Sequence, residues 1–126
     1  MIFVDTNYFL RFLLKDVKSQ HQEAKELFLK GASGELKLFT SLVVIFEIYW
    51  VLTSFYQKKK AKVIQTLEQI FALKFIEIEN KKLLERALQI YKKTNIDLED
   101  CYNLVLAKEK RVKEFKTFDK RLKKLF

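Results

Sequence analysis

The sequence predicts a single α/β domain over residues 1–126, in which a short parallel sheet is flanked by helices on both faces. Three observations lead to this prediction. The chain has 126 residues, which is a usual length for one domain. It is 49% hydrophobic and contains 12 Phe, so it can bury a sizeable core. Short apolar runs alternate with helical patterns, and this order is typical of a parallel sheet with crossover helices.

Short apolar runs that end in turn residues or charges predict the strands. The expected strands cover residues 2–5, 36–40, 75–78 and 115–118. Between them, apolar side chains recur at helical spacing. The expected helices cover residues 6–14, 19–31, 41–56, 61–71, 80–91, 97–106 and a basic segment from 119 onwards.

Polar residues mark the start of several of these helices. Ser19 and Gln22 form a capping-box pattern, in which each side chain satisfies a free backbone amide of the first turn. Thr40 or Ser41 is expected to cap the long third helix, and Asn80 is expected to cap a later one.

The composition excludes several function classes. One His and one Cys rule out a disulfide framework and most zinc sites, and a single Cys indicates a reducing, cytoplasmic setting. With no Pro and 2 Gly, the chain has no glycine-rich phosphate loop. The N-terminus resembles a strand and not a signal peptide, and the apolar run Leu42–Leu52 is too short to cross a bilayer. We expect no membrane partner, and His21 is expected at the surface.

The formal net charge of +9 indicates an anionic partner such as nucleic acid, or a general preference for lysine at the surface. The same two interpretations apply to Lys58–Lys60 and to the basic segment Lys110–Lys124. Trp50 and its aromatic neighbours are expected to pack in the core or in a dimer interface.

Glu47 is the most informative acid, because it lies inside the apolar run Leu42–Leu52. A helix with this pattern is expected to be buried nearly all round. A lone carboxylate there would cost several kcal/mol unless it were paired or neutralised. Three interpretations are open: an edge position that reaches solvent, an ion pair with a lysine, or a site that uses the charge.

Other acids follow expected strands or open expected helices. Asp5 ends one expected strand and Asp119 directly follows another, and the carboxyl ends of parallel strands are where ligands bind. Asp97 and Asp100 lie in the first turn of one helix, where Asp100 shares a face with Leu104. Each of these acids is also a good helix cap or a suitable partner for the helix dipole.

A parallel sheet can bring Asp5, Glu47, Asp100 and Asp119 to one edge. Carboxylates gathered in this way repel each other, and a divalent cation removes the repulsion. A ligand set made only of oxygen atoms favours Mg²⁺ or Mn²⁺, which activate water and stabilise charge on a phosphodiester. A basic protein with such a pocket is expected to be a metal-dependent nuclease.

The order of these motifs resembles the PIN-domain family. Val4–Asn7 is similar to the first motif of that family, and the hydrophobic segment Phe46–Leu52 with its glutamate is similar to the second. Asp97–Leu104 resembles the D-x-x-D-A-L-I segment, with Cys101 in place of the frequent alanine, and Thr117–Leu122 resembles the closing T-x-D motif.

The resemblance implies a PIN fold and cleavage of single-stranded or structured RNA with Mg²⁺ or Mn²⁺. It implies a catalytic and metal-binding set consisting of Asp5, Glu47, Asp100 and Asp119, with Asp97 as an accessory metal ligand. Thr6, Asn7 and Thr117 would support that set by hydrogen bonding. A domain of this length resembles VapC-type toxins, which implies a homodimer and a cognate antitoxin.

Two other functions remain open at the level of sequence. A housekeeping RNA-processing nuclease would carry the same motifs. A non-catalytic basic module that binds RNA or protein would use the acids only as helix caps, but it does not explain Glu47.

Overall fold

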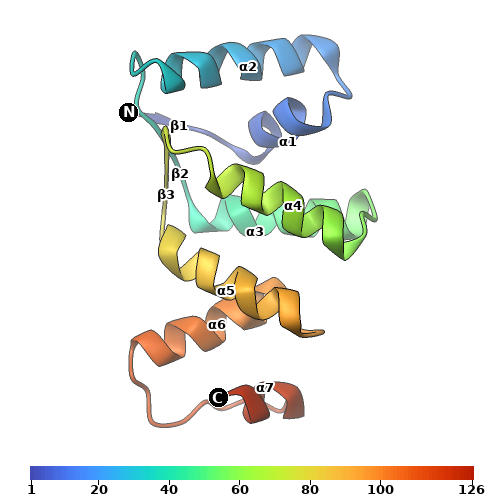
Figure 1. Cartoon of the computed structure of the whole chain (residues 1–126), viewed down its shortest axis with the longest axis vertical. Coiled ribbons are helices and arrows are strands. Elements are labelled where there is room, and N and C mark those ends of the chain that lie inside the picture. The colour runs from blue at the N-terminus through green and yellow to red at the C-terminus, as the bar shows by residue number, and fades with distance from the viewer. The chain divides into compact units, whose positions relative to one another are not determined.

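The computed structural model describes residues 1–126 and divides them into two compact units, Met1–Glu79 and Asn80–Phe126 (Figure 1). The first contains the whole sheet, and the second consists of helices and connecting segments. None of the helices combines the length and the apolar character that a membrane span requires.

The first unit alternates strands and helices as the sequence predicts. Its elements are β1 (Ile2–Phe3), α1 (Thr6–Leu14), α2 (Lys18–Ala32), β2 (Leu38–Thr40), α3 (Leu42–Trp50), the π-helical turn η1 (Val51–Phe55), α4 (Lys60–Phe71) and β3 (Ile76–Ile78). The strands are parallel and lie in the order β1-β2-β3. A short parallel sheet flanked by helices is therefore confirmed.

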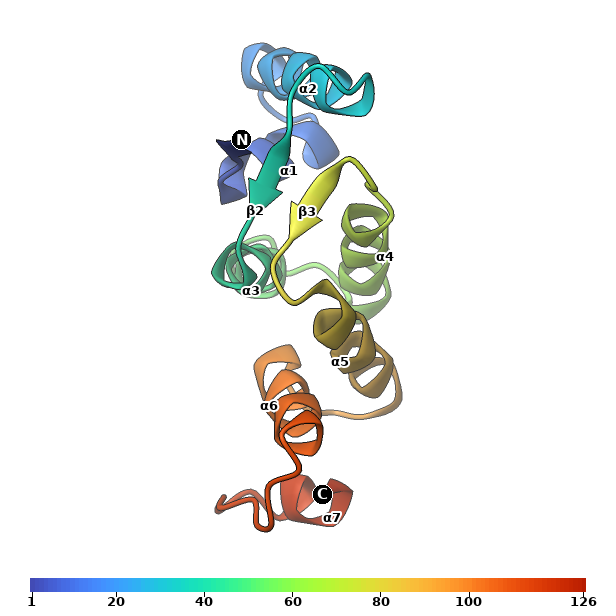
Figure 2. The ribbon, with the colours of Figure 1, turned by 90° about the vertical axis from the view of Figure 1, so that its left-hand side faces the viewer.

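The two faces of this sheet differ. Leu38 and Ile76 pair in register and are buried, whereas the alternate residues Phe3 and Glu77 are exposed. Figures 1 and 2 show α1, α3 and α4 on one side of the strands. Within this unit these three helices lie on the same face of the sheet. The reason is topological, because successive right-handed crossovers in the order β1-β2-β3 place their helices on the same face.

The covered face carries the core of the first unit. Its fully buried side chains include those of Val4, Phe9, Leu10, Ile45, Ile48, Leu67 and Ile70. Val4 follows β1, and the other six residues come from the inner faces of α1, α3 and α4, where the apolar residues recur at helical spacing.

The second unit contains α5 (Lys81–Lys93), α6 (Leu98–Glu109) and α7 (Lys120–Leu125). Helices α5 and α6 pack against each other, and α7 packs against α6. The buried side chains of this unit include Leu84, Leu88, Leu98, Leu104 and Leu122.

Two local predictions are wrong. The fourth strand at 115–118 does not form: the segment pairs with no other strand, and Phe118 is fully exposed. An extended segment becomes a strand only when a neighbour completes its hydrogen bonds, and its sequence does not supply that neighbour. The capping box is also absent, because α2 begins at Lys18 with Val17 as its cap and no side-chain cap bond.

Candidate active site

Asp5 lies two residues after the end of β1 and caps the N-terminus of α1. Its Oδ1 accepts a hydrogen bond from the backbone N–H of Thr6 at 2.8 Å. The preceding Val4 is buried, and its carbonyl oxygen accepts a bond of 2.7 Å from Oγ1 of Thr40 in β2. The strand end that carries Asp5 is therefore fixed to the neighbouring strand.

Thr6 and Asn7, the predicted supporting residues, lie in the first turn of α1. Thr6 is 3% exposed, and its Oγ1 has no hydrogen-bond partner. A buried hydroxyl without a partner is uncommon and marks a place where a further polar group fits. Asn7 is exposed and lines a hollow together with Tyr8, Arg11 and Glu23.

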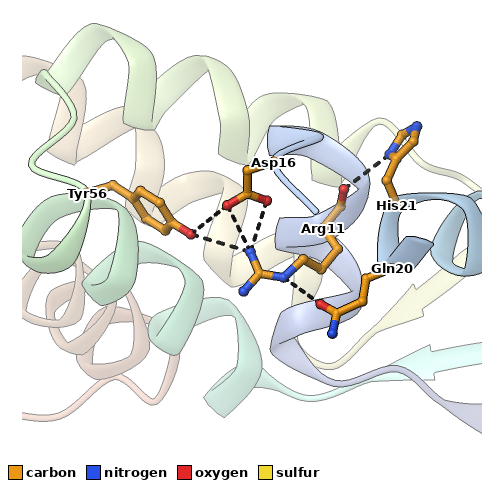
Figure 3. Close-up of polar contacts among 5 residues, drawn as sticks. All are labelled: Arg11, Asp16, Gln20, His21 and Tyr56. Carbon is orange, nitrogen blue, oxygen red and sulfur yellow. Dashed lines mark hydrogen bonds and ion pairs between the residues drawn. The ribbon is translucent and has the colours of Figure 1, made fainter. Parts of the chain in front are cut away.

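A polar cluster around Arg11 holds α1 in place (Figure 3). Arg11 donates from Nη1 to both carboxylate oxygens of Asp16, at 3.0 and 3.1 Å, and from Nε to Oε1 of Gln20 at 2.8 Å. The Tyr56 hydroxyl donates to Asp16 at 3.2 Å, and Nδ1 of His21 lies 3.1 Å from the Arg11 carbonyl oxygen. His21 lies on α2 and is half-buried, and its ring stacks on that of Phe12 with the ring centroids 5.9 Å apart.

Glu47 lies on the solvent-exposed side of α3. Val43 and Trp50, one turn before and after it, are 70% and 59% exposed, and Glu47 is exposed as well. The helix is therefore not buried all round, because only its opposite side, with Ile45 and Ile48, packs into the core. The exposed carboxylate fits an edge position that reaches solvent, and it carries no cost of burial. Use of the charge by a site is compatible with this exposure and stays a prediction.

Trp50 was expected in the core or in a dimer interface. Its exposure excludes the core of this chain.

Asp97, Asp100 and Asp119 are brought together in the second unit. Asp97 caps α6, and its carbonyl oxygen accepts a bond of 3.0 Å from the N–H of Cys101. Asp119 caps α7, where its Oδ1 accepts from the N–H of Arg121 at 2.8 Å. Oγ1 of Thr117 accepts a hydrogen bond from the N–H of Asp119 at 3.0 Å, so Thr117 fixes the backbone at this cap.

The three carboxylates influence one another. Burial raises the pKa of Asp100, the charges of Asp97 and Asp119 raise it further, and the charge of Arg121 opposes them. The side-chain hydrogen bond from Arg121 lowers the pKa of Asp119. Burial also raises the pKa of Glu99, with contributions from Asp97 and Asp100, although the residue as a whole is exposed.

Arg121 was not predicted from the sequence. It looks like one of many basic residues near the C-terminus, and only its place two residues after Asp119 could have indicated a partner. Its side chain bonds to Asp119, and its Nη1 donates to the carbonyl oxygen of Asn95 at 2.8 Å.

The donor chemistry at these positions fits a hard divalent cation. The candidate ligands are carboxylate oxygens, and a hydroxyl without a partner lies beside Asp5. Neither unit by itself places three His, Cys, Asp or Glu side chains around a common point at ligand distance.

Comparisons with known proteins relate this chain to one family. A model of the PIN domain matches residues 2–125. The chain is 30% identical over 128 residues to a VapC ribonuclease of Aquifex aeolicus (strain VF5), and the match covers 99% of this chain and 92% of the relative. A solved structure, VapC20 of Mycobacterium tuberculosis, described as a toxin that cleaves the sarcin-ricin loop, has a TM-score of 0.45 and 17% identity. The match covers 99% of this chain and 95% of that one.

Proposed function

The chain belongs to the PIN domain family, and on this premise we propose that it is a metal-dependent endoribonuclease, the toxin of a toxin–antitoxin pair. The observation that carries the proposal is the match of nearly the whole chain to a VapC ribonuclease, with the motif acids present in this sequence. We propose further that residues 1–126 act as one domain in the cytoplasm, as a homodimer with a cognate antitoxin.

The residues that would hold Mg²⁺ or Mn²⁺ are Asp5, Glu47, Asp97, Asp100 and Asp119. Bound there, the ion would activate water and stabilise the charge that builds on the phosphodiester. The chain's own groups prepare the site: Thr117 fixes the backbone at Asp119, and Thr40 fixes the end of β1 before Asp5. Lysines of the basic surface would bind the RNA backbone.

RNA cleavage by purified protein in the presence of Mn²⁺ tests the proposal. Asp5→Asn and Asp100→Asn should each reduce the cleavage rate by about 10²- to 10³-fold, as loss of a group that stabilises the transition state does in other enzymes. Glu47→Gln should also reduce the rate. Glu109→Gln is the matched control, because Glu109 forms an exposed ion pair with Arg86. If all three variants cleave RNA at the wild-type rate and a chelator does not inhibit them, the proposal is wrong.

A non-catalytic binding module is the second candidate, and one observation favours it. Asp5 and Asp119 do accept helix-capping hydrogen bonds, which is the role that such a module would give them. Titration of MnCl₂ into the protein distinguishes the two candidates. Binding that is lost in Asp100→Asn supports the nuclease, and the absence of acid-dependent binding supports the module.

The role of the nuclease in the cell requires a different measurement. A toxin should arrest growth when it is expressed alone, and co-expression of a small protein from a neighbouring reading frame should relieve the arrest. A housekeeping RNA-processing nuclease should do neither.

A further inference from the structure

Arg121 lies among the candidate acids of the second unit. Its Nη2 donates to Oδ2 of Asp119 at 3.0 Å, and its Nε donates to Oδ1 at 3.3 Å. On the other side of the guanidinium, Nη1 donates to the carbonyl oxygen of Asn95 at 2.8 Å. The side chain therefore joins the first turn of α7 to the segment that precedes α6.

The charge of Arg121 also acts on the two acids of α6. Asp97 and Asp100 both interact with it electrostatically, while the acids themselves repel each other. The guanidinium thus reduces the repulsion within a group of carboxylates that a divalent cation would otherwise have to neutralise.

Arginine suits this position better than lysine. Its planar group presents several donors in fixed directions, so it can bind a carboxylate along one edge and a carbonyl oxygen with another N–H. A lysine would supply the same charge but not the two-sided hydrogen bonding.

We propose that Arg121 is a positioning residue for the metal site of the proposed nuclease. It directs Asp119 toward the start of α6 and partly neutralises Asp97, Asp100 and Asp119 when no divalent cation is bound. This inference rests on the proposed function, because it assigns the residue a role at the metal site of that enzyme.

The two roles have opposite consequences when Arg121 is replaced by a neutral residue. Loss of the positive charge removes its repulsion of an incoming divalent cation, so metal affinity should rise. Loss of the hydrogen bonds releases Asp119, so cleavage should slow. A general loss of structure would lower both quantities.

The experiment compares Arg121→Gln and Arg121→Lys with the wild type in the full chain. Calorimetric titration with MnCl₂ should give Arg121→Gln about fivefold tighter binding, the effect of roughly one screened charge near the ion. Its RNA cleavage at saturating Mn²⁺ should fall about tenfold, as for loss of a group that orients a metal ligand. Arg121→Lys should keep wild-type affinity but cleave slowly. In EDTA, Arg121→Gln should unfold at a lower temperature than the wild type.

Arg86→Gln is the control, since Arg86 forms an exposed ion pair with Glu109 in the same unit. It should change neither affinity nor cleavage. Unchanged or weaker Mn²⁺ binding by Arg121→Gln would overturn the inference. If Arg121→Gln does not fold, Arg121→Lys provides the test. Cleavage of RNA by Arg121→Lys at the wild-type rate would then contradict the inference. A wild-type protein that neither binds Mn²⁺ nor cleaves RNA would instead refute the proposed function itself.

Discussion

Thr40 shows how one buried hydroxyl prepares the position of a candidate acid. It is fully buried, and its Oγ1 bonds to the carbonyl oxygen of Val4, while the N–H of Val4 donates to Phe39 at 2.8 Å. These bonds extend the pairing of β1 and β2 to the residue before Asp5. The direction in which the chain leaves the sheet is thereby fixed.

Thr40→Val should destabilise the protein by about 1–3 kcal/mol, because it keeps the shape of the side chain and leaves the buried carbonyl of Val4 without that donor. Thr40→Ser retains the hydroxyl and can keep this hydrogen bond, so it should destabilise the protein less than Thr40→Val does. Urea unfolding of both variants checks the prediction. Equal stability of the valine variant and the wild type would contradict it.

Asp100 is an acid whose charge opposes folding. Because its pKa is raised in the folded protein, mainly by burial, the folded state binds more protons than the unfolded state between the ordinary and the raised pKa. The stabilisation that this difference in pKa contributes is therefore fully present below the ordinary pKa of aspartate. It is lost as the pH rises through the raised pKa of Asp100. Asp119 has the opposite sign, since its pKa is lowered by Arg121.

Asp100→Asn should raise the melting temperature of the metal-free protein at pH 7 by about 1–3 °C, a fraction of a kcal/mol for a half-buried group. The gain should vanish near pH 3, where the wild-type carboxyl is protonated as well. Thermal unfolding in EDTA at both pH values measures the effect. An equal gain at pH 3 would show that charge is not its cause.

Helix α3 illustrates a difference between an apolar sequence and a buried helix. Its inner side packs into the core, while Val43, Glu47 and Trp50 share an exposed side. Ser41 starts the helix as predicted, since its Oγ accepts from the N–H of Val44 at 3.2 Å. The cap and the helix are local features, but burial depends on which side finds a partner.

Glu47→Gln should change the free energy of unfolding by less than about 0.5 kcal/mol, because the carboxylate is exposed. A buried, uncompensated carboxylate would instead make the substitution strongly stabilising. Urea unfolding without metal distinguishes these cases. A gain of several kcal/mol would indicate that Glu47 is buried in solution.

At the scale of the whole molecule, the net charge of +9 is the balance of 25 basic and 16 acidic residues. The segment Lys58–Lys60 joins η1 to α4. Lys58 and Lys59 are exposed, and Lys60, the first residue of α4, is half-buried. Contact with RNA and simple solvation remain the two interpretations of this segment.

Replacement of Lys58, Lys59 and Lys60 by Gln tests the RNA interpretation. Binding of a non-cleavable single-stranded RNA in EDTA should depend less steeply on salt. The slope of log K against log salt should fall by about 2 if each lysine contacts one phosphate. Fluorescence anisotropy at several salt concentrations gives the slope.

A variant of equal charge provides the comparison. In it, Lys25, Lys30 and Lys37, which are exposed elsewhere on the first unit, are replaced by Gln. If both variants reduce the slope equally, the effect is one of net charge and Lys58–Lys60 have no special role.

The sequence by itself determined the order and approximate limits of most elements. Apolar spacing places α1, α4 and α5, and the alternation of strands with helices leads to a parallel sheet. The candidate acids were also found in the sequence, because residue types in motif order need no coordinates. These features depend on residues close together in the chain, so local patterns suffice to predict them.

Only the tertiary structure decided the features that need a partner far along the chain. Residues 115–118 have the pattern of a strand but no neighbouring strand, and Glu47 lies in an apolar helix but on its exposed side. Arg121 became a candidate positioning residue only because α7 brings it to the carbonyl of Asn95 and the acids of α6. Hydrogen bonding, burial and electrostatic interaction each require two groups at short distance, and folding creates that proximity.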